Sequence, residues 1–599
     1  MARIWFVASA VLGMGVFFLF SGNASAQVPD DDPANGYEKE GMLIENGTTF
    51  GYVGNNGVTA SETALGEDDN RGYFVDDLTL QLKKDTFRFG GTLAFRMFPA
   101  SPVVIQAPTG SMPREHVTTY RYTNDLALER IWMRYDIDAS RILFGDMALT
   151  IGKGIAFSVG KRTQGWVDTS LRGAGFEYRK EGRFLLAGYG GATNAADVDP
   201  VTQSVLDAEP GDGVAALIAQ IQLAEAIRIG AHGVYVEPRY DDAQSITPER
   251  LWVDQGPGIR LATAGGMFEL RLGGISFYTE GNWQQHDNYR VVAHDPVRDE
   301  TGAAVYSSLS WESGPYFRRI QLALTLEGIF YHRFLAEGTY RSALGGYTME
   351  SSVTYHRMPT LEPSWVVIRS LGNAAGGKMD ASVFVKRTDT RFSLSSNVMG
   401  YLGGVGADGQ WDAFSEVLTV HPLLSIEQKG RRRDASLTMT FGGRYEKSDI
   451  PTPGYVRSGY LWHGGVEGRI RIASRSELML SSMLRRHRLG VMERNDDYWV
   501  SDNGLALQLN PHWRFGVSLQ YSDELRGADR QPLQLGGVTS PASSWFPGGE
   551  IGYSGSGLFR SFSAVLQGGA TRGGEKCVDG ICRVFPNSAG FTVGVRYQL

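Results

Sequence analysis

The last nine residues of the chain alternate between apolar and polar side chains without a break. One set contains Phe591, Val593, Val595, Tyr597 and Leu599, and the other contains Thr592, Gly594, Arg596 and Gln598. Because successive side chains of a β-strand point to opposite faces, this segment predicts a strand with one apolar and one polar face. One face suits lipid and the other suits water, so the rest of the chain should carry further strands of the same kind.

The same nine residues resemble the C-terminal signal of outer-membrane β-barrel proteins, in which the last strand ends on an aromatic residue and carries others at alternate positions before it. The residues that match are Phe591, Val593, Val595 and Tyr597, with Leu599 in the terminal position where Phe is usual. The resemblance implies that these five residues form an assembly signal, which the barrel-assembly machinery of the outer membrane would read.

Segments with this alternation recur along the chain, as expected of tilted strands that cross an outer membrane. Residues 87–97, 437–445 and 513–521 each place apolar and aromatic side chains on one face and small, polar or Arg side chains on the other. An Arg that faces lipid near the bilayer centre costs about 2–4 kcal/mol, so these arginines should face a wet interior. The predicted lumen-lining residues are Arg88, Arg96, Arg444, Arg469, Arg514 and Arg596.

Short and long connections alternate between these segments. Short joints at 83–86, 138–140, 180–182, 224–225 and 264–266 are separated by long ones at 99–124, 152–170, 194–212, 238–257 and 286–302. Short periplasmic turns and long outer loops are typical of outer-membrane barrels, so we expect an all-β fold, a single transmembrane antiparallel up-and-down β-barrel of about 24 strands (range 22–26). Residues 332–376 are either one long outer loop or contain a further hairpin, which would give about 26 strands.

The N-terminus predicts export. Residues 4–20 contain no charged side chain, follow Arg3 and lead into Ala24-Ser25-Ala26, the pattern of a signal peptide spanning residues 1–26. The acidic segment 27–41 should be a disordered periplasmic lead-in, followed by an outer-membrane barrel over residues 42–599. With 76 Gly, 26 Tyr, 29 Phe and 12 Trp, the composition favours many amphipathic strands, and a net charge of −7 argues against nucleic acid as a partner.

The chain contains two cysteines, Cys577 and Cys582, close together near the C-terminus. After export to an oxidising compartment, a disulfide between them is the favoured interpretation. Two cysteines without a neighbouring histidine do not match the usual four-ligand pattern of a metal site, and we expect no metal and no cofactor.

A Gly-rich stretch begins at Lys153 and leads through Phe157 and Trp166 to Arg172. This stretch resembles a segment of large, functionally uncharacterised outer-membrane β-barrels of Gram-negative bacteria, a resemblance that implies membership of the barrel class and no activity. A loop of this composition either folds inward and narrows the lumen, which makes Phe157, Trp166 and Arg172 candidate constriction residues, or extends outward to face lipopolysaccharide.

A barrel of this size needs something in its lumen. Barrels of 16–18 strands already leave an aqueous channel, so about 24 strands without a plug would leave a hole too wide for a cell to tolerate. We expect outer loops, with 332–376 and 99–124 the best candidates, or a partner protein to fill it. The first hypothesis is a channel or export and uptake barrel for a bulky solute or polymer, with anionic cargo favoured by the predicted luminal arginines.

The alternative hypothesis is a structural outer-membrane scaffold that anchors a surface or periplasmic complex. The sequence contains no Gly-x-Ser-x-Gly, His-Glu-x-x-His or phosphate-binding loop, so we do not expect an enzyme. The partners we expect are outer-membrane lipid and lipopolysaccharide, the assembly machinery, and a lumen-filling or periplasmic protein.

Overall fold

The structure is a computed structural model, and its description covers most of the chain after residue 40. The described ranges are 41–55, 71–100, 125–162, 167–180, 183–193, 196–198, 205–208, 212–237, 260–289, 298–314, 319–334, 356, 359, 361, 374–401, 417–430, 434–447, 456–491, 494–522, 545–555, 561–572, 574–578, 581–585 and 588–598. The predicted signal peptide and almost all of the predicted lead-in lie outside these residues.

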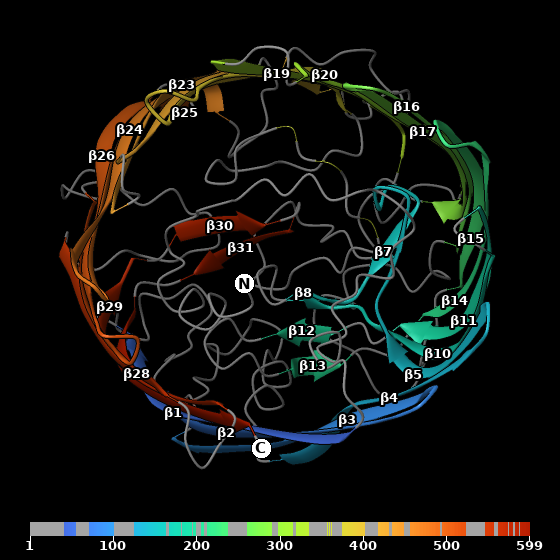
Figure 1. Cartoon of the computed structure of the whole chain (residues 1–599), viewed down its shortest axis with the longest axis horizontal. Coiled ribbons are helices and arrows are strands. Elements are labelled where there is room, and N and C mark those ends of the chain that lie inside the picture. Colours follow the sequence, from blue (N-terminus) through green and yellow to red (C-terminus); the bar gives the residue numbers. More distant parts are fainter. Residues whose placement is uncertain are drawn as a thin grey trace, which may run out of the picture.

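Twenty-four antiparallel strands form one closed ring, as the sequence predicts (Figure 1). The first twelve in order around the ring are β1 (Gly41–Asn55), β2 (Arg71–Lys84), β3 (Phe87–Ala100), β4 (Asp125–Ile137), β5 (Ser140–Met147), β10 (Leu171–Lys180), β11 (Phe184–Thr193), β14 (Gly213–Ala224), β15 (Ile227–Glu237), β16 (Arg260–Leu272), β17 (Ile275–Tyr289) and β18 (Arg298–Glu312). The second twelve are β19 (Ile320–His332), β20 (Ala374–Val385), β21 (Thr390–Tyr401), β22 (Val417–Lys429), β23 (Ala435–Lys447), β24 (Val456–Ala473), β25 (Ser476–Val491), β26 (Arg494–Leu509), β27 (Trp513–Ser522), β28 (Trp545–Gly555), β29 (Ser561–Thr571) and β32 (Ser588–Gln598). Strand β32 pairs with β29 on one side and with β1 on the other, which closes the barrel.

Large apolar side chains are exposed on one face of the barrel strands, whereas the other face is more buried. In β2, Leu78, Leu80 and Leu82 are exposed on one face, whereas Tyr73 and Val75 on the other face are buried. Since one face is apolar and exposed all around a closed sheet, the outside of the barrel suits lipid, the arrangement of a transmembrane barrel. Within the described ranges, no helix is long and apolar enough to cross a bilayer.

The turns agree with the predicted short joints, with one exception. The joint predicted at 264–266 is wrong, because these residues lie inside β16 and the turn follows at Gly273 and Gly274. The long loop predicted from residue 286 begins later, since β17 continues to Tyr289. A run of Gly in a strand imitates a turn in sequence, but here the ladders on both sides continue through it.

The stretch 332–376 contains no additional barrel hairpin, because β19 pairs directly with β20. The strand number is therefore 24 and not 26.

Within the described ranges, eight short strands lie outside the ring ladder. They are β6 (Leu149–Ile151), β7 (Phe157–Val159), β8 (Lys161–Arg162), β9 (Val167–Asp168), β12 (Ala196–Val198), β13 (Val205–Ala208), β30 (Gly574–Val578) and β31 (Ile581–Phe585). Strands β6 and β7 form a hairpin, and β8, β9, β12 and β13 form a small sheet. In the view along the barrel axis, β7, β8, β12 and β13 project inside the ring (Figure 1).

Candidate functional site

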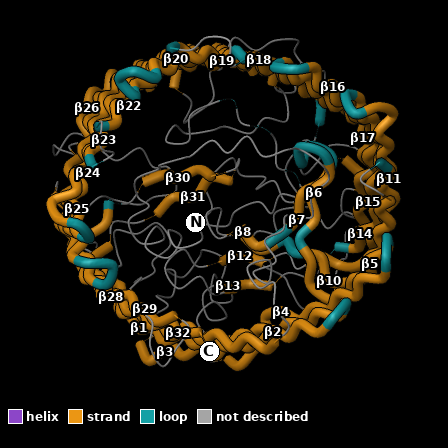
Figure 2. The backbone as a smooth tube through the Cα atoms, in the orientation of Figure 1, coloured by secondary structure: helices purple, strands orange, loops and turns teal. Residues whose placement is uncertain are grey.

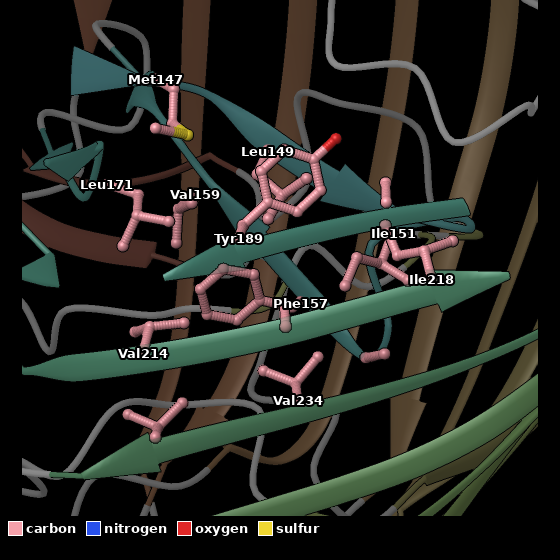
Figure 3. Close-up of a cluster of buried hydrophobic side chains, with 14 of the residues drawn as sticks. Met147, Leu149, Ile151, Phe157, Val159, Leu171, Tyr189, Val214, Ile218 and Val234 are labelled. Carbon is pink, nitrogen blue, oxygen red and sulfur yellow. The ribbon is translucent and has the colours of Figure 1, made fainter. Parts of the chain in front are cut away.

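Residues 149–170, which we call the lumen segment, connect β5 to β10, and their described parts, 149–162 and 167–170, fold back into the barrel. Phe157 is buried in an apolar cluster with Val214 of β14 and Val234 of β15 (Figure 3). These wall residues alternate with exposed neighbours such as Leu217 and Tyr235, so the lumen segment packs on the face that points away from lipid. The tube view shows β6 and β7 inside the ring, along the wall that carries β10, β14 and β15 (Figure 2).

The apolar inner wall explains why the segment stays there. Leu185, Ala187, Val214, Ile218 and Val236 are wall residues that belong to this cluster and are almost fully buried. Inward positions of a water-filled barrel are normally polar. Burial of apolar area contributes about 25 cal/mol per Å², so the hairpin and this wall stabilise each other by excluding water from between them.

Glu280 of β17 anchors the tip of the β6–β7 hairpin. Its side chain is 0% exposed and its Oε2 accepts a hydrogen bond from the backbone N–H of Lys153 at 2.8 Å. Tyr278 donates its hydroxyl to the same Oε2 at 2.6 Å, and Asn282 donates an amide hydrogen to Oε1 at 3.0 Å. A buried carboxylate requires such donors, and here one of the three comes from the lumen segment.

A second anchor lies at the other end of the segment. Lys161 of β8 forms an ion pair with Glu129 of β4, and Arg96 of β3 lies 3.8 Å from the same carboxylate. The side chains of Arg96 and Glu129 are each 6% exposed. Separating the members of a buried ion pair is unfavourable, because it leaves an uncompensated charge. The pair between Lys161 and Glu129 therefore holds this end of the segment against the wall.

The connection between β19 and β20 also contributes to the filling of the lumen. Its described residues Phe334, His356 and Leu361 are buried, and Phe334 and Leu361 share a cluster with Ile155 of the hairpin tip. The His356 Nδ1 lies 2.7 Å from the carbonyl oxygen of Ile155. Most of residues 332–376 and nearly all of 99–124, the two stretches expected to fill the lumen, lie outside the described residues.

Gly152 is the position in the tip that tolerates a side chain least. Its φ is +59°, and a Cβ there would lie 2.2 Å from Oε2 of Glu280. We expect Gly152→Ala to weaken the anchor, because the left-handed backbone alone costs about 1–2 kcal/mol and the clash adds to it. Faster tryptic cleavage after Lys153 in the folded barrel would report this loosening. Gly273→Ala is the control, since Gly273 has a φ of +56° and no atom within 4 Å of the added carbon.

Several of the predicted luminal arginines have carboxylate partners, which the sequence prediction missed. The pairs are Arg96 with Glu129 at 3.8 Å, Arg444 with Glu446 at 3.0 Å, Arg469 with Glu477 at 3.3 Å, Arg514 with Glu550 at 3.1 Å, and Arg596 with Glu45 at 3.2 Å. Arg88 lies on the same face of β3 as Arg96, opposite the exposed Leu93 and Phe95. Most of these carboxylates lie on a neighbouring strand, so no local sequence signal marks them.

The three candidate constriction residues lie in different places. Phe157 is buried against the inner wall, and Trp166 lies outside the described residues. Arg172 is on the same face of β10 as the exposed Phe176 and pairs with Asp146 of β5, with its Nε 2.7 Å from Oδ1 and its Nη2 3.0 Å from Oδ2. The geometry therefore separates Arg172 from Phe157, and a narrowing role remains a prediction for Phe157 and Trp166.

Cys577 and Cys582 are direct partners in the ladder between β30 and β31. This register is compatible with the disulfide that the sequence predicts, and the disulfide stays a prediction. We expect intact-mass analysis after iodoacetamide treatment to find no alkylated cysteine until a reductant is added. Two alkylated cysteines in the unreduced protein would contradict the disulfide.

The predicted assembly signal occupies β32. Phe591 is exposed and packs against Phe50 of β1, with ring centroids 5.9 Å apart and ring planes tilted by 53°. Val593, Val595 and Tyr597 follow it at alternate positions of β32, and Leu599 lies outside the described residues. A role in assembly stays a prediction for these five residues.

A closed ring of antiparallel strands, apolar outside and filled by its own connections, defines a transmembrane β-barrel of the outer-membrane type. No protein-family profile and no characterised protein matches the chain in sequence. Among solved structures, the chain is similar to the FrpB iron transporter from Neisseria meningitidis, with 10% identity over 94% of this chain and 83% of that one and a TM-score of 0.46. It is also similar to the P pilus usher PapC translocation pore, with 10% identity, coverage of 93% and 99%, and a TM-score of 0.38. A third similar structure is OccAB1 from Acinetobacter baumannii, with 9% identity, coverage of 70% and 94%, and a TM-score of 0.38.

Proposed function

We propose that the protein is an outer-membrane channel for a bulky polar solute or polymer, with a passage narrowed by the lumen segment. The observation that carries this proposal is that the lumen segment covers one part of the inner wall and is anchored there. The two apolar clusters that include its residues extend over the inner faces of strands from β5 to β21. The remaining wall, from β22 through β32 and on from β1 to β4, contributes no residue to these clusters within the described ranges.

The remaining wall carries polar side chains that are open to water. The side chain of Arg469 is 58% exposed and that of Arg596 is 45% exposed. Gln567 of β29 donates to Glu550 of β28 at 3.0 Å, and both lie opposite the exposed Leu566 and Ile551, which continues the polar lining across these strands. A polar and hydrated strip of this kind supports the passage of a hydrophilic solute beside the lumen segment.

The pairing of the arginines defines the cargo preference that we propose. Each paired guanidinium has a carboxylate within 4 Å, so the pairs add little net charge to the wall. A charge-balanced wall favours a polar solute without strong selection by the sign of its charge. The anionic preference expected from the arginines alone would appear only where a carboxylate partner is removed.

Ion selectivity in planar bilayers tests this proposal. We expect residues 27–599 to show weak selectivity between potassium and chloride, and Glu477→Gln combined with Glu550→Gln to shift the reversal potential clearly toward chloride. Asp497→Asn is the matched control, because Asp497 pairs with Arg486, whose guanidinium lies over the exposed Trp499 on the outward face. An unchanged reversal potential in the double variant would contradict a passage along this wall.

Heat-modifiable gel mobility must confirm that each barrel is folded. A folded barrel that conducts neither as the complete barrel nor after removal of the lumen segment would overturn the channel and favour the scaffold hypothesis.

A further inference from the structure

Two histidines from different strands meet on the inner wall, away from the lumen segment. His421 of β22 lies on the face opposite the exposed Leu418 and Leu424, and His463 of β24 is opposite the exposed Trp462. Their Nε2 atoms are 3.2 Å apart, and their rings are perpendicular. Both side chains are buried, at 1% and 6% exposed.

Gly442 allows the two rings to meet. It lies on β23, between the two histidine strands, and is the direct ladder partner of His463. A Cβ at Gly442 would lie 2.3 Å from both Cε1 and Nε2 of His463 and 2.9 Å from the carbonyl oxygen of Pro422. A larger residue at this position would therefore displace the His463 ring from His421.

We propose that His421 and His463 bind one divalent transition-metal ion, copper or zinc, through their Nε2 atoms. Imidazole nitrogen is a preferred ligand of both metals, and affinity among the first-row divalent ions is greatest for copper. With metal–nitrogen bonds of about 2.0–2.1 Å, a separation of 3.2 Å corresponds to an angle at the metal of about 100°. This angle lies between square-planar and tetrahedral values, so the separation of the two nitrogens suits two ligands of one ion.

Two neighbouring side chains supply the second observation. Asn397 of β21 is the direct ladder partner of His421, and Thr419 is two residues before His421 on the same face of β22. Both are almost completely buried, and the amide atoms of Asn397 and the hydroxyl of Thr419 have no hydrogen-bond partner among the described residues. A buried polar group without a partner costs about 1–3 kcal/mol, so these groups point to an occupant that bonds to them, such as water on a metal ion.

The charged neighbours of the pair are balanced. Arg444 forms an ion pair with Glu446 at 3.0 Å, and Arg485, the ladder partner of His463, forms one with Asp502. The local charge is therefore compatible with a cation.

No group of three or more His, Cys, Asp or Glu that could hold a metal occurs in the described part of the chain. Two histidines thus leave the other coordination positions of the ion to water, in contrast to a structural zinc site with four protein ligands.

Titration of the metal-free barrel, residues 27–599 in detergent micelles, with copper(II) or zinc(II) tests the site. We expect one equivalent to bind, and the copper(II) electron paramagnetic resonance spectrum to show coupling to two imidazole nitrogens. His421→Gln, His463→Gln and Gly442→Ala should each weaken binding at least about tenfold, the scale of loss seen when even outer-shell partners of a metal are removed. His512→Gln is the control, because His512 is an exposed turn residue whose Nδ1 lies 2.7 Å from the Ser554 carbonyl oxygen.

Either of two results would overturn the site: no bound equivalent in the folded barrel, or equal affinity in His421→Gln, His463→Gln and the control. Gel mobility before and after heating separates loss of binding from loss of fold. The inference does not depend on transport, since a silent barrel can still bind the ion.

Discussion

Replacing residues 149–170 with a short Gly-Ser linker is expected to raise the single-channel conductance of the barrel several-fold. The lumen segment lies on the inner face of the barrel and is held there by an apolar cluster and two polar anchors. Met147 and Leu171 are direct partners in the ladder between β5 and β10, so a linker of about four residues can close this hairpin. Removing the segment then widens the passage without breaking the barrel ladder.

The deletion needs a control for a general loosening of the barrel. The same linker in place of residues 341–373 tests the stretch that the sequence favours for closure. A conductance rise from that variant alone would contradict the role of the lumen segment. Because the deletion leaves apolar wall residues such as Val214 and Val234 facing water, we also expect a lower melting temperature, which differential scanning calorimetry in detergent would measure.

Glu280→Leu is expected to release the hairpin tip while the barrel remains closed. The substitution removes the acceptor of three donors, from Lys153, Tyr278 and Asn282. Each buried donor that loses its acceptor costs about 1–3 kcal/mol, so the anchored arrangement should lose several kcal/mol. We expect tryptic cleavage after Lys153 to become much faster, and current recordings to show frequent transitions between conductance levels.

Two control variants test whether the effect is specific to the Glu280 carboxylate. Glu280→Gln keeps an amide oxygen as acceptor and should have a smaller effect. Glu269→Leu removes a carboxylate of the adjacent strand β16, which pairs with Arg228 and Arg271 and has no described contact with the lumen segment. Cleavage after Lys153 that accelerates equally in Glu269→Leu and Glu280→Leu would show that Glu280 is no specific anchor.

The barrel wall follows from local alternation, and the sequence predicts it well. Side chains two residues apart share a face, so the pattern of Phe591, Val593, Val595 and Tyr597 is sufficient to define an amphipathic strand. The prediction fails at 264–266, where Gly residues resemble a turn but belong to a strand that continues on both sides. Local composition cannot distinguish these cases, because the deciding hydrogen bonds come from neighbouring strands.

The contents of the barrel could not be predicted in the same way. The Lys153 N–H and the Glu280 carboxylate are separated by 127 residues, and Arg596 and Glu45 come from opposite ends of the chain. The predicted arginines lie on the strand faces opposite the exposed apolar side chains. Their carboxylate partners and the histidine pair can be identified only once the register between neighbouring strands is known.

The sequence by itself determined the class of fold and the outward apolar surface and limited the number of strands to about 22–26, since these depend on the period of side chains along each strand and on connection length. Only the tertiary structure decided that residues 149–170 fold inward, that Glu280 anchors them, and that His421 meets His463 over Gly442. The physical reason is that a barrel wall is built from local periodicity, whereas its lumen is built from contacts between strands whose closeness depends on register and closure of the whole ring.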